Sequence, residues 1–278
     1  MNRDLFWQSV RGLCIILVVL IHLPLGLESD DSFAVWLGVR NFINFPVATF
    51  VFLSAYFCKY KRGDSILPFF GRRLRRLLIP YLIFAVLYIV IVPYLQNGHI
   101  SDNAIFELFT GYGPTYFLLV LVQFTLITPI IVNTLSKPSL RWINYIITPV
   151  YIAIYYFYNF KTGEELKASQ TCFAAWYIFY YLGFVIRNAK VRLPSSLSLF
   201  SLMIFCMVLS EIESYSIFKY LGEYSFAISQ IKISSILSSL TVILLFVKFA
   251  GYQHKATVLS ELGDYSMGIF LLHHRIEP

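Results

Sequence analysis

The chain has 278 residues, of which 58% are hydrophobic and 13% are charged, and its mean hydropathy is +0.69. Soluble domains carry about 25% charged residues, so this composition argues against a soluble protein and predicts one polytopic membrane domain over residues 1–278. The net charge of +7 comes from cations near the ends of apolar segments, which favours membrane topology signals and ligand contacts over a nucleic-acid partner.

The first apolar segment carries two ionisable side chains. It reads RGLCIILVVLIH from Arg11 to His22. Eleven residues of α-helix turn through about 1100° and rise about 16 Å, so Arg11 and His22 lie on one face, one near each end. Polar groups at membrane depth usually face a protein interior or a water-filled cavity. A lone histidine is more often bonded to a neighbouring helix or a lipid headgroup. The alignment of His22 with Arg11 on one face favours a functional role instead. Imidazole suits such a role, since it accepts a proton near neutral pH.

Apolar runs of membrane length recur along the chain and predict an all-α bundle of about eight complete transmembrane helices plus an incomplete ninth. The predicted helices lie near 10–27, 42–58, 77–95, 114–132, 142–158, 173–187, 196–212 and 225–249, and the ninth begins near 264.

The connections between these helices alternate in charge. Cations dominate the even connections: Lys59, Lys61, Arg62, Arg72, Arg73, Arg75, Arg76, Lys137, Arg141, Arg187, Lys190, Arg192, Lys248, His254 and Lys255. Acidic residues dominate the odd ones: Glu28, Asp30, Asp31, Asp102, Glu107, Glu164, Glu165, Glu211 and Glu213. The positive-inside rule therefore predicts that the N-terminus and the even connections are cytoplasmic, with Arg11 at the cytoplasmic end of its helix and His22 toward the outer leaflet.

Four arginines, Arg72, Arg73, Arg75 and Arg76, stand in the stretch FFGRRLRRLLIPY of residues 69–81. They could be a plain cytoplasmic anchor, but four guanidinium groups in five positions exceed what topology needs. Arginine forks bind phosphate in a bidentate manner, so a phosphate-rich ligand such as coenzyme A could dock here. The headgroups of anionic membrane lipids are the competing ligand.

Other polar residues favour structural roles. Ser54, in an aromatic and apolar run, is more often a packing residue than a nucleophile, and Tyr116 is typical of an aromatic belt. Cys14, Cys58, Cys172 and Cys206 have no metal-ligand spacing, so we expect no metal. YLGEYSFAISQ at 220–230 and ELGDYSMGIFL at 261–271 are similar, but they read as two helix starts rather than a duplication.

Five stretches occur in the order typical of one family: RGLCIILVVLIH, FVFLSAYF, RRLRRLLIPY, GPTYFLL and LGDYSMGIFLLHH. Together they resemble acyltransferase family 3, whose members include O-antigen and exopolysaccharide O-acetyltransferases of bacterial inner membranes. The resemblance covers nearly the whole chain. It implies acetyl-coenzyme A as cytoplasmic donor, a glycan as acceptor on the outer side, catalytic roles for Arg11 and His22, and donor binding by Arg72, Arg73, Arg75 and Arg76.

The sequence departs from the family pattern at several positions. Gln8 stands where an acidic residue is usual, Ala55 where a glycine is common, and Tyr116 where a tryptophan often stands. A full helix usually follows the LGxxS motif, whereas this chain ends at Pro278, which suggests a truncated gene product or a fragment.

These observations predict a membrane O-acyltransferase that moves an acyl group, most simply acetyl, from acetyl-coenzyme A to a hydroxyl of a cell-surface or exported carbohydrate. The acceptor could be O-antigen, exopolysaccharide or a lipid-linked glycan. Two alternatives remain open: a transporter or flippase of glycan intermediates, and an inactive truncated relative.

Overall fold

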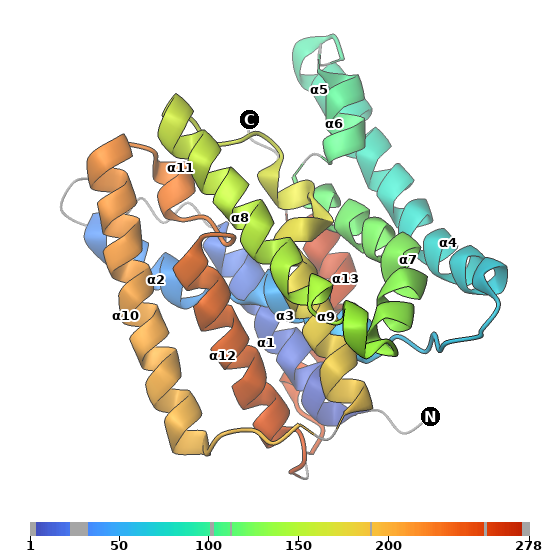
Figure 1. Ribbon diagram of the computed structural model, residues 1–278. Coiled ribbons are helices and arrows are strands. Elements are labelled where there is room, and N and C mark those ends of the chain that lie inside the picture. Colours follow the sequence, from blue (N-terminus) through green and yellow to red (C-terminus); the bar gives the residue numbers. More distant parts are fainter. Residues whose placement is uncertain are drawn as a thin grey trace.

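The computed structural model describes residues 4–22, 33–100, 103–111, 113–189, 191–252 and 255–273, and every regular element within these ranges is helical (Figure 1). The α-helices are α1 (Leu5–Ile21), α2 (Phe33–Phe42), α3 (Pro46–Tyr56), α4 (Ile66–Ala85), α5 (Val92–Asn97), α6 (Ala104–Thr110), α7 (Thr115–Leu135), α8 (Ile143–Thr162), α9 (Phe173–Asn188), α10 (Ser196–Leu221), α11 (Tyr224–Ala227), α12 (Ile233–Phe249) and α13 (Val258–Leu272). A π-helix η1 (Val86–Ile91) joins α4 to α5, and the 3-10 turns η2 (Pro138–Leu140) and η3 (Ser169–Thr171) precede α8 and α9.

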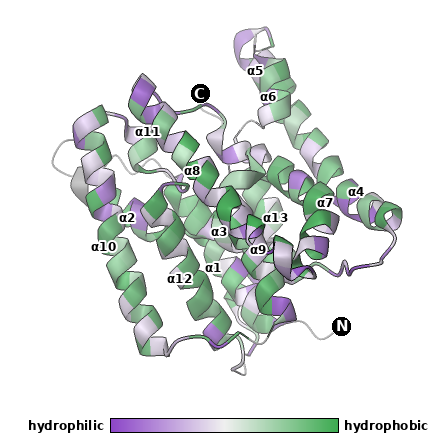
Figure 2. Cartoon of the chain, in the orientation of Figure 1, coloured by the Kyte–Doolittle hydropathy of each residue, from purple (hydrophilic) through white to green (hydrophobic). Residues whose placement is uncertain are grey.

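The helices have the length and apolar character of a membrane protein, as the composition predicts. Within the part of the chain that the structure describes, four helical segments are long and apolar enough to cross a bilayer: Leu37–Tyr56, Ile66–Asn97, Thr115–Leu135 and Ser196–Leu221. Figure 2 shows hydrophobic residues along α7 and α12 and hydrophilic ones toward helix ends. The most apolar windows of the second and fourth segments are only 22% and 17% buried, so their outer faces are apolar surface that lipid tails can cover.

Several helix boundaries differ from the predicted ones, for local reasons. Helix α1 begins at Leu5 rather than near 10, because the Asp4 side chain accepts a hydrogen bond from the Trp7 amide and caps the helix. Helix α4 begins at Ile66 rather than near 77, so the four arginines lie on a helix and not in the connection before it. The prediction of alternating charge in the connections also rests on residues that lie outside the described ones: Glu28, Asp30, Asp31, Asp102, Lys190 and His254.

The predicted helix 225–249 is in fact two helices, α11 and α12, separated by a non-helical break that ends at Lys232. The Lys232 side chain is fully buried. Its Nζ donates to Asn41 Oδ1 at 2.6 Å, to the Ala227 carbonyl at 3.0 Å and to the Ser210 carbonyl at 3.2 Å. One ammonium thus satisfies acceptors on α2, α10 and α11, which explains how a helix can be interrupted inside an apolar bundle.

Helices α1 and α13 form a close parallel pair. The hydroxyl oxygens of Ser9 and Thr257 lie 3.3 Å apart at one end of the pair. Gly12 and Gly263 stand where the two backbones meet: a methyl group on Gly12 would come within 1.9 Å of the Leu259 carbonyl oxygen, and one on Gly263 within 2.0 Å of the Gln8 carbonyl oxygen. Small residues allow this approach between helices. The glycine of LGDYS is therefore a packing residue that holds the C-terminal helix against the first helix.

Candidate functional site

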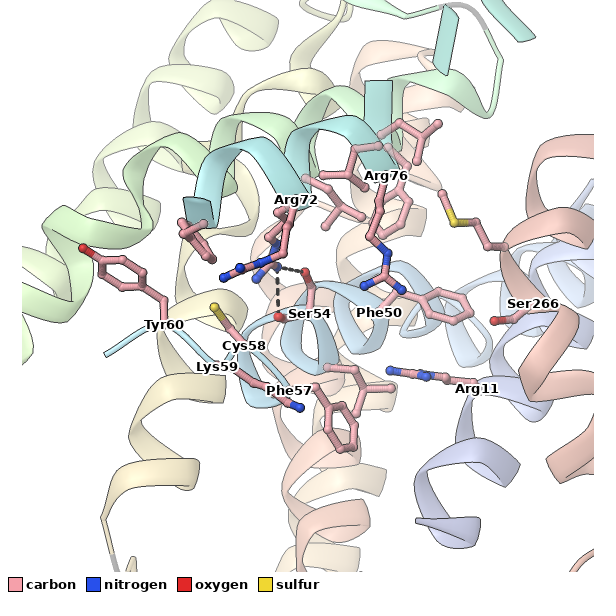
Figure 3. A pocket seen from close by; sticks show the side chains of 18 of the residues that line it. Arg11, Phe50, Ser54, Phe57, Cys58, Lys59, Tyr60, Arg72, Arg76 and Ser266 are labelled. Carbon is pink, nitrogen blue, oxygen red and sulfur yellow. Dashed lines mark hydrogen bonds between the residues drawn. The ribbon is translucent and has the colours of Figure 1, made fainter. Parts of the chain in front are cut away.

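A cavity of about 1100 Å³ lies among α1, α3, α4, α7 and α13 (Figure 3). Its walls combine cationic side chains with aromatic ones. The cations are Arg11, Lys59, Arg72, Arg73 and Arg76, and the aromatic side chains are Phe50, Phe57, Tyr60, Phe69, Phe117 and Phe270. Ligand pockets of drug-sized molecules are about 300–1,000 Å³, so this cavity can hold a large ligand.

Arg11 reaches the cavity from α1 and is held by a short polar chain. Its Nη1 donates to Gln8 Oε1 at 3.3 Å, and Gln8 Nε2 donates to Asp264 Oδ1 at 3.0 Å. The guanidinium also lies over the Phe57 ring, 5.2 Å from its centroid, in a cation–π contact. Gln8 therefore links Arg11 to a carboxylate on α13, which gives a structural role to the position that departs from the family pattern.

Arg73 is fixed against α3. Its Nη2 donates to the Ser54 carbonyl at 3.0 Å and to the Ser54 hydroxyl at 2.6 Å, and its guanidinium lies 5.8 Å from the centroid of the Phe69 ring. The Ser54 hydroxyl accepts from a cation here, which is a structural contact rather than activation by a base. Ser54 thus joins the cavity as the residue that orients Arg73.

The remaining cluster arginines divide into two sets. Arg72 and Arg76 line the cavity, and Figure 3 shows both side chains directed into the same space as Arg11. Positions 72 and 76 are one helical turn apart and share a face of α4. Arg75 is exposed and does not belong to the cavity lining. The structure therefore brings three of the four predicted arginines together with Arg11, and it leaves Arg75 outside.

His22 lies elsewhere, at the C-terminal end of α1, and does not line this cavity. His22 follows Arg11 by eleven positions, which corresponds to a rise of about 16 Å along the helix. Its ring centroid is 4.9 Å from that of His273, the residue that follows α13. Arg40 Nη1 donates to the Ile21 carbonyl at 2.7 Å and so fixes the chain directly before His22. The assignment of His22 and Arg11 as catalytic stays a prediction.

An aromatic wall runs from the cavity to the two histidines. The rings of Phe50 and Phe117 pack against Phe270, with centroids 6.4 Å and 5.1 Å away, and all three line the cavity. The Phe270 ring in turn lies 5.3 Å from the His273 ring. The cavity and His22 are thus the two ends of one continuous set of side chains.

Sequence reasoning did not identify Gln8, Asp264, Ser266, Phe57 or His273 as site residues. Three of them, Asp264, Ser266 and His273, belong to the stretch LGDYSMGIFLLHH, which indicated a helix start and the family but no role for these side chains. Asp264 accepts from Gln8 on α1, 256 positions away in the chain, and His273 lies against His22, so the spacing within the motif could not reveal these contacts.

Comparison with known proteins agrees with this picture. A curated relative is "Putative membrane-bound acyltransferase YfiQ" of Bacillus subtilis (strain 168), which is 21% identical over 293 residues that cover 96% of this chain and 78% of the relative. No solved structure matches the chain significantly. A family model described as "Acyltransferase domain" matches residues 4–276. The chain therefore belongs to this acyltransferase family, acyltransferase family 3, and is a membrane acyltransferase.

Proposed function

We propose that this membrane acyltransferase transfers acetyl from acetyl-coenzyme A to a hydroxyl of a cell-surface or exported carbohydrate, and so modifies a polysaccharide such as O-antigen lipopolysaccharide by O-acetylation. The proposed location is the bacterial inner membrane with a cytoplasmic N-terminus, which the loop charges favour. The observation that carries the proposal is the convergence of Arg11, Arg72, Arg73 and Arg76 on one large cavity.

The cavity suits the donor in charge and in shape. Acetyl-coenzyme A carries phosphates at one end and a long, uncharged arm of methylene and amide groups that ends in the thioester. Guanidinium groups bind phosphate through two parallel hydrogen bonds, and Arg72 and Arg76 present theirs from one face of α4. The uncharged arm would lie along Phe50, Phe117 and Phe270, and these rings lead from the arginines toward His273 and His22.

The proposed reaction uses His22 as the base. The acceptor hydroxyl gives its proton to the imidazole as its oxygen attacks the thioester carbonyl. A carbon–oxygen bond forms, the carbon–sulfur bond breaks, and the imidazolium returns the proton to the departing coenzyme A thiolate. Arg11, at the cavity end of α1, would orient the donor or stabilise its charge. A general base contributes about 10²–10⁴-fold to such a rate.

The acceptor would approach at the other end of α1. His22 stands there at the exposed end of the helix, whereas the arginines stand near the start of α1. A glycan on the outer side and a donor from the cytoplasm would then meet along one helix. The two substrates need no shared entrance in this arrangement.

The proposal is tested with purified full-length protein in proteoliposomes supplied with acetyl-coenzyme A and the surface-glycan fraction of a strain that lacks the chain. We expect release of coenzyme A together with alkali-labile acetyl on the glycan. Glycan movement across the bilayer without coenzyme A release would instead identify a transporter. Neither activity in a folded sample would point to an inactive relative.

A further inference from the structure

His22 and His273 stand at the ends of α1 and α13, and the backbone just before each of them accepts a hydrogen bond from a neighbouring helix. Arg40 on α2 donates to the Ile21 carbonyl, directly before His22. Tyr88 on η1 donates its hydroxyl to the Leu271 carbonyl at 2.8 Å, two residues before His273. Both attachments lie on the final residues of their helices, where carbonyls lack intrahelical partners. The backbones that carry the two rings are therefore fixed independently of any contact between the rings.

The hydrogen bond of His273 defines which of its nitrogens carries a proton. Its Nδ1 lies 2.5 Å from the Phe270 carbonyl oxygen. A carbonyl oxygen only accepts, so Nδ1 must hold the hydrogen. In the neutral ring, Nε2 is then an acceptor. Packing of the ring against Phe270, at 5.3 Å between centroids, restricts its rotation.

We infer that His273 is a positioning residue for His22: Nε2 of His273 accepts the N–H of the His22 imidazole and thereby fixes the orientation and tautomer of that ring. The observation behind this inference is the 4.9 Å separation of the two ring centroids, with planes inclined by 48°. The opposite nitrogen of His22 then keeps its lone pair and faces away from His273. In the proposed reaction, this nitrogen would take the proton of the acceptor hydroxyl.

This inference rests on the proposed function, because it assigns His273 a role through His22. It follows the same physical logic as other catalytic imidazoles, whose second nitrogen is held by a partner that sets the tautomer. Loss of such a partner costs about 10–100-fold for histidines that bind metals, and we expect a loss of similar size here. His273 itself does not line the donor cavity, so its loss should change kcat and leave the apparent affinity for acetyl-coenzyme A unchanged.

Three variants of the full-length protein in proteoliposomes test the inference, with the glycan fraction described above as acceptor. His273→Phe keeps the ring and removes both nitrogens, and we expect kcat to fall about 10–100-fold. His273→Gln places an amide near the position of Nε2 and should restore much of kcat. His273→Asn places one near Nδ1 and should not. Leu272→Ala, at an exposed neighbour, is the matched control and should behave as the wild type.

The outcomes separate this inference from the proposed function. Wild-type kcat in His273→Phe, while His22→Ala is inactive, would overturn the positioning role and leave the proposed base in place. Equal losses in the Phe, Gln and Asn variants would show that the ring only packs, which also overturns the inference. Retained transfer in His22→Ala would overturn both. If His273→Phe does not fold, the Gln and Asn pair still decides between the outcomes.

Discussion

Replacing Arg76 and Arg75 separately distinguishes a donor site from a cytoplasmic anchor. Both residues are cations on α4 and contribute equally to the positive-inside rule, but only Arg76 lines the cavity. Arg76→Gln removes a charge-assisted hydrogen bond to the donor, which is worth about 1.5–3 kcal/mol. Since about 1.4 kcal/mol corresponds to a tenfold change in Kd, acetyl-coenzyme A should bind roughly 10- to 100-fold more weakly. Arg75→Gln should leave the affinity unchanged.

The assay is calorimetric titration of coenzyme A into detergent-solubilised protein at two salt concentrations. Wild-type binding should weaken as salt rises, because exposed charges are screened, and the Arg76→Gln variant should show a smaller salt dependence. Arg72→Gln should resemble Arg76→Gln. The two losses need not add, because the residues share one ligand. Equal affinities in the wild type and the Arg76 variant, or an equal loss in the Arg75 variant, would refute the assignment of the cavity to the donor.

Two further predictions concern packing and orientation. Gly263→Ala would press a methyl group into the Gln8 carbonyl, so we expect destabilisation of about 1–3 kcal/mol and a lower Tm in detergent. Gly268→Ala, with open space around it in the same helix, is the control and should melt at or slightly above the wild-type Tm, because alanine is the better helix former. A topology reporter inserted within 59–65 should read cytoplasmic and one within 163–167 external, and the reverse at either place would contradict the proposed orientation and the cytoplasmic route of the donor.

Much of the fold could be predicted from the sequence, because membrane helices are set by local apolar composition. Breaks within a helical apolar run were harder to predict. The run 225–249 contains Gln230 and Lys232, and these polar residues were the available sign of the break. The partners that make the break stable, Asn41 and Ser210, come from other helices, so no local pattern could show that Lys232 would be satisfied there.

The candidate site could also be predicted only in part, because the sequence shows single residues but not how the helices that carry them pack. Arg11 and the arginine cluster were each visible as cations in unusual places, and their convergence on one cavity depends on how α1 and α4 pack. The exclusion of Arg75 depends on which face of α4 meets the cavity, and this follows from the packing of α4 against other helices. Gln8 was noted only as a departure from the family pattern, because its partner Asp264 lies far away in the chain.

The central claim is that His22 acts as the base in acetyl transfer to a glycan. The most direct measurement compares label transferred from [¹⁴C]acetyl-coenzyme A to surface glycan by wild-type protein and by His22→Ala, with membrane level and Tm determined in the same preparations. The account predicts an inserted, folded variant whose transfer is about 10²–10⁴-fold lower. Wild-type transfer by a normally inserted His22→Ala protein would contradict it.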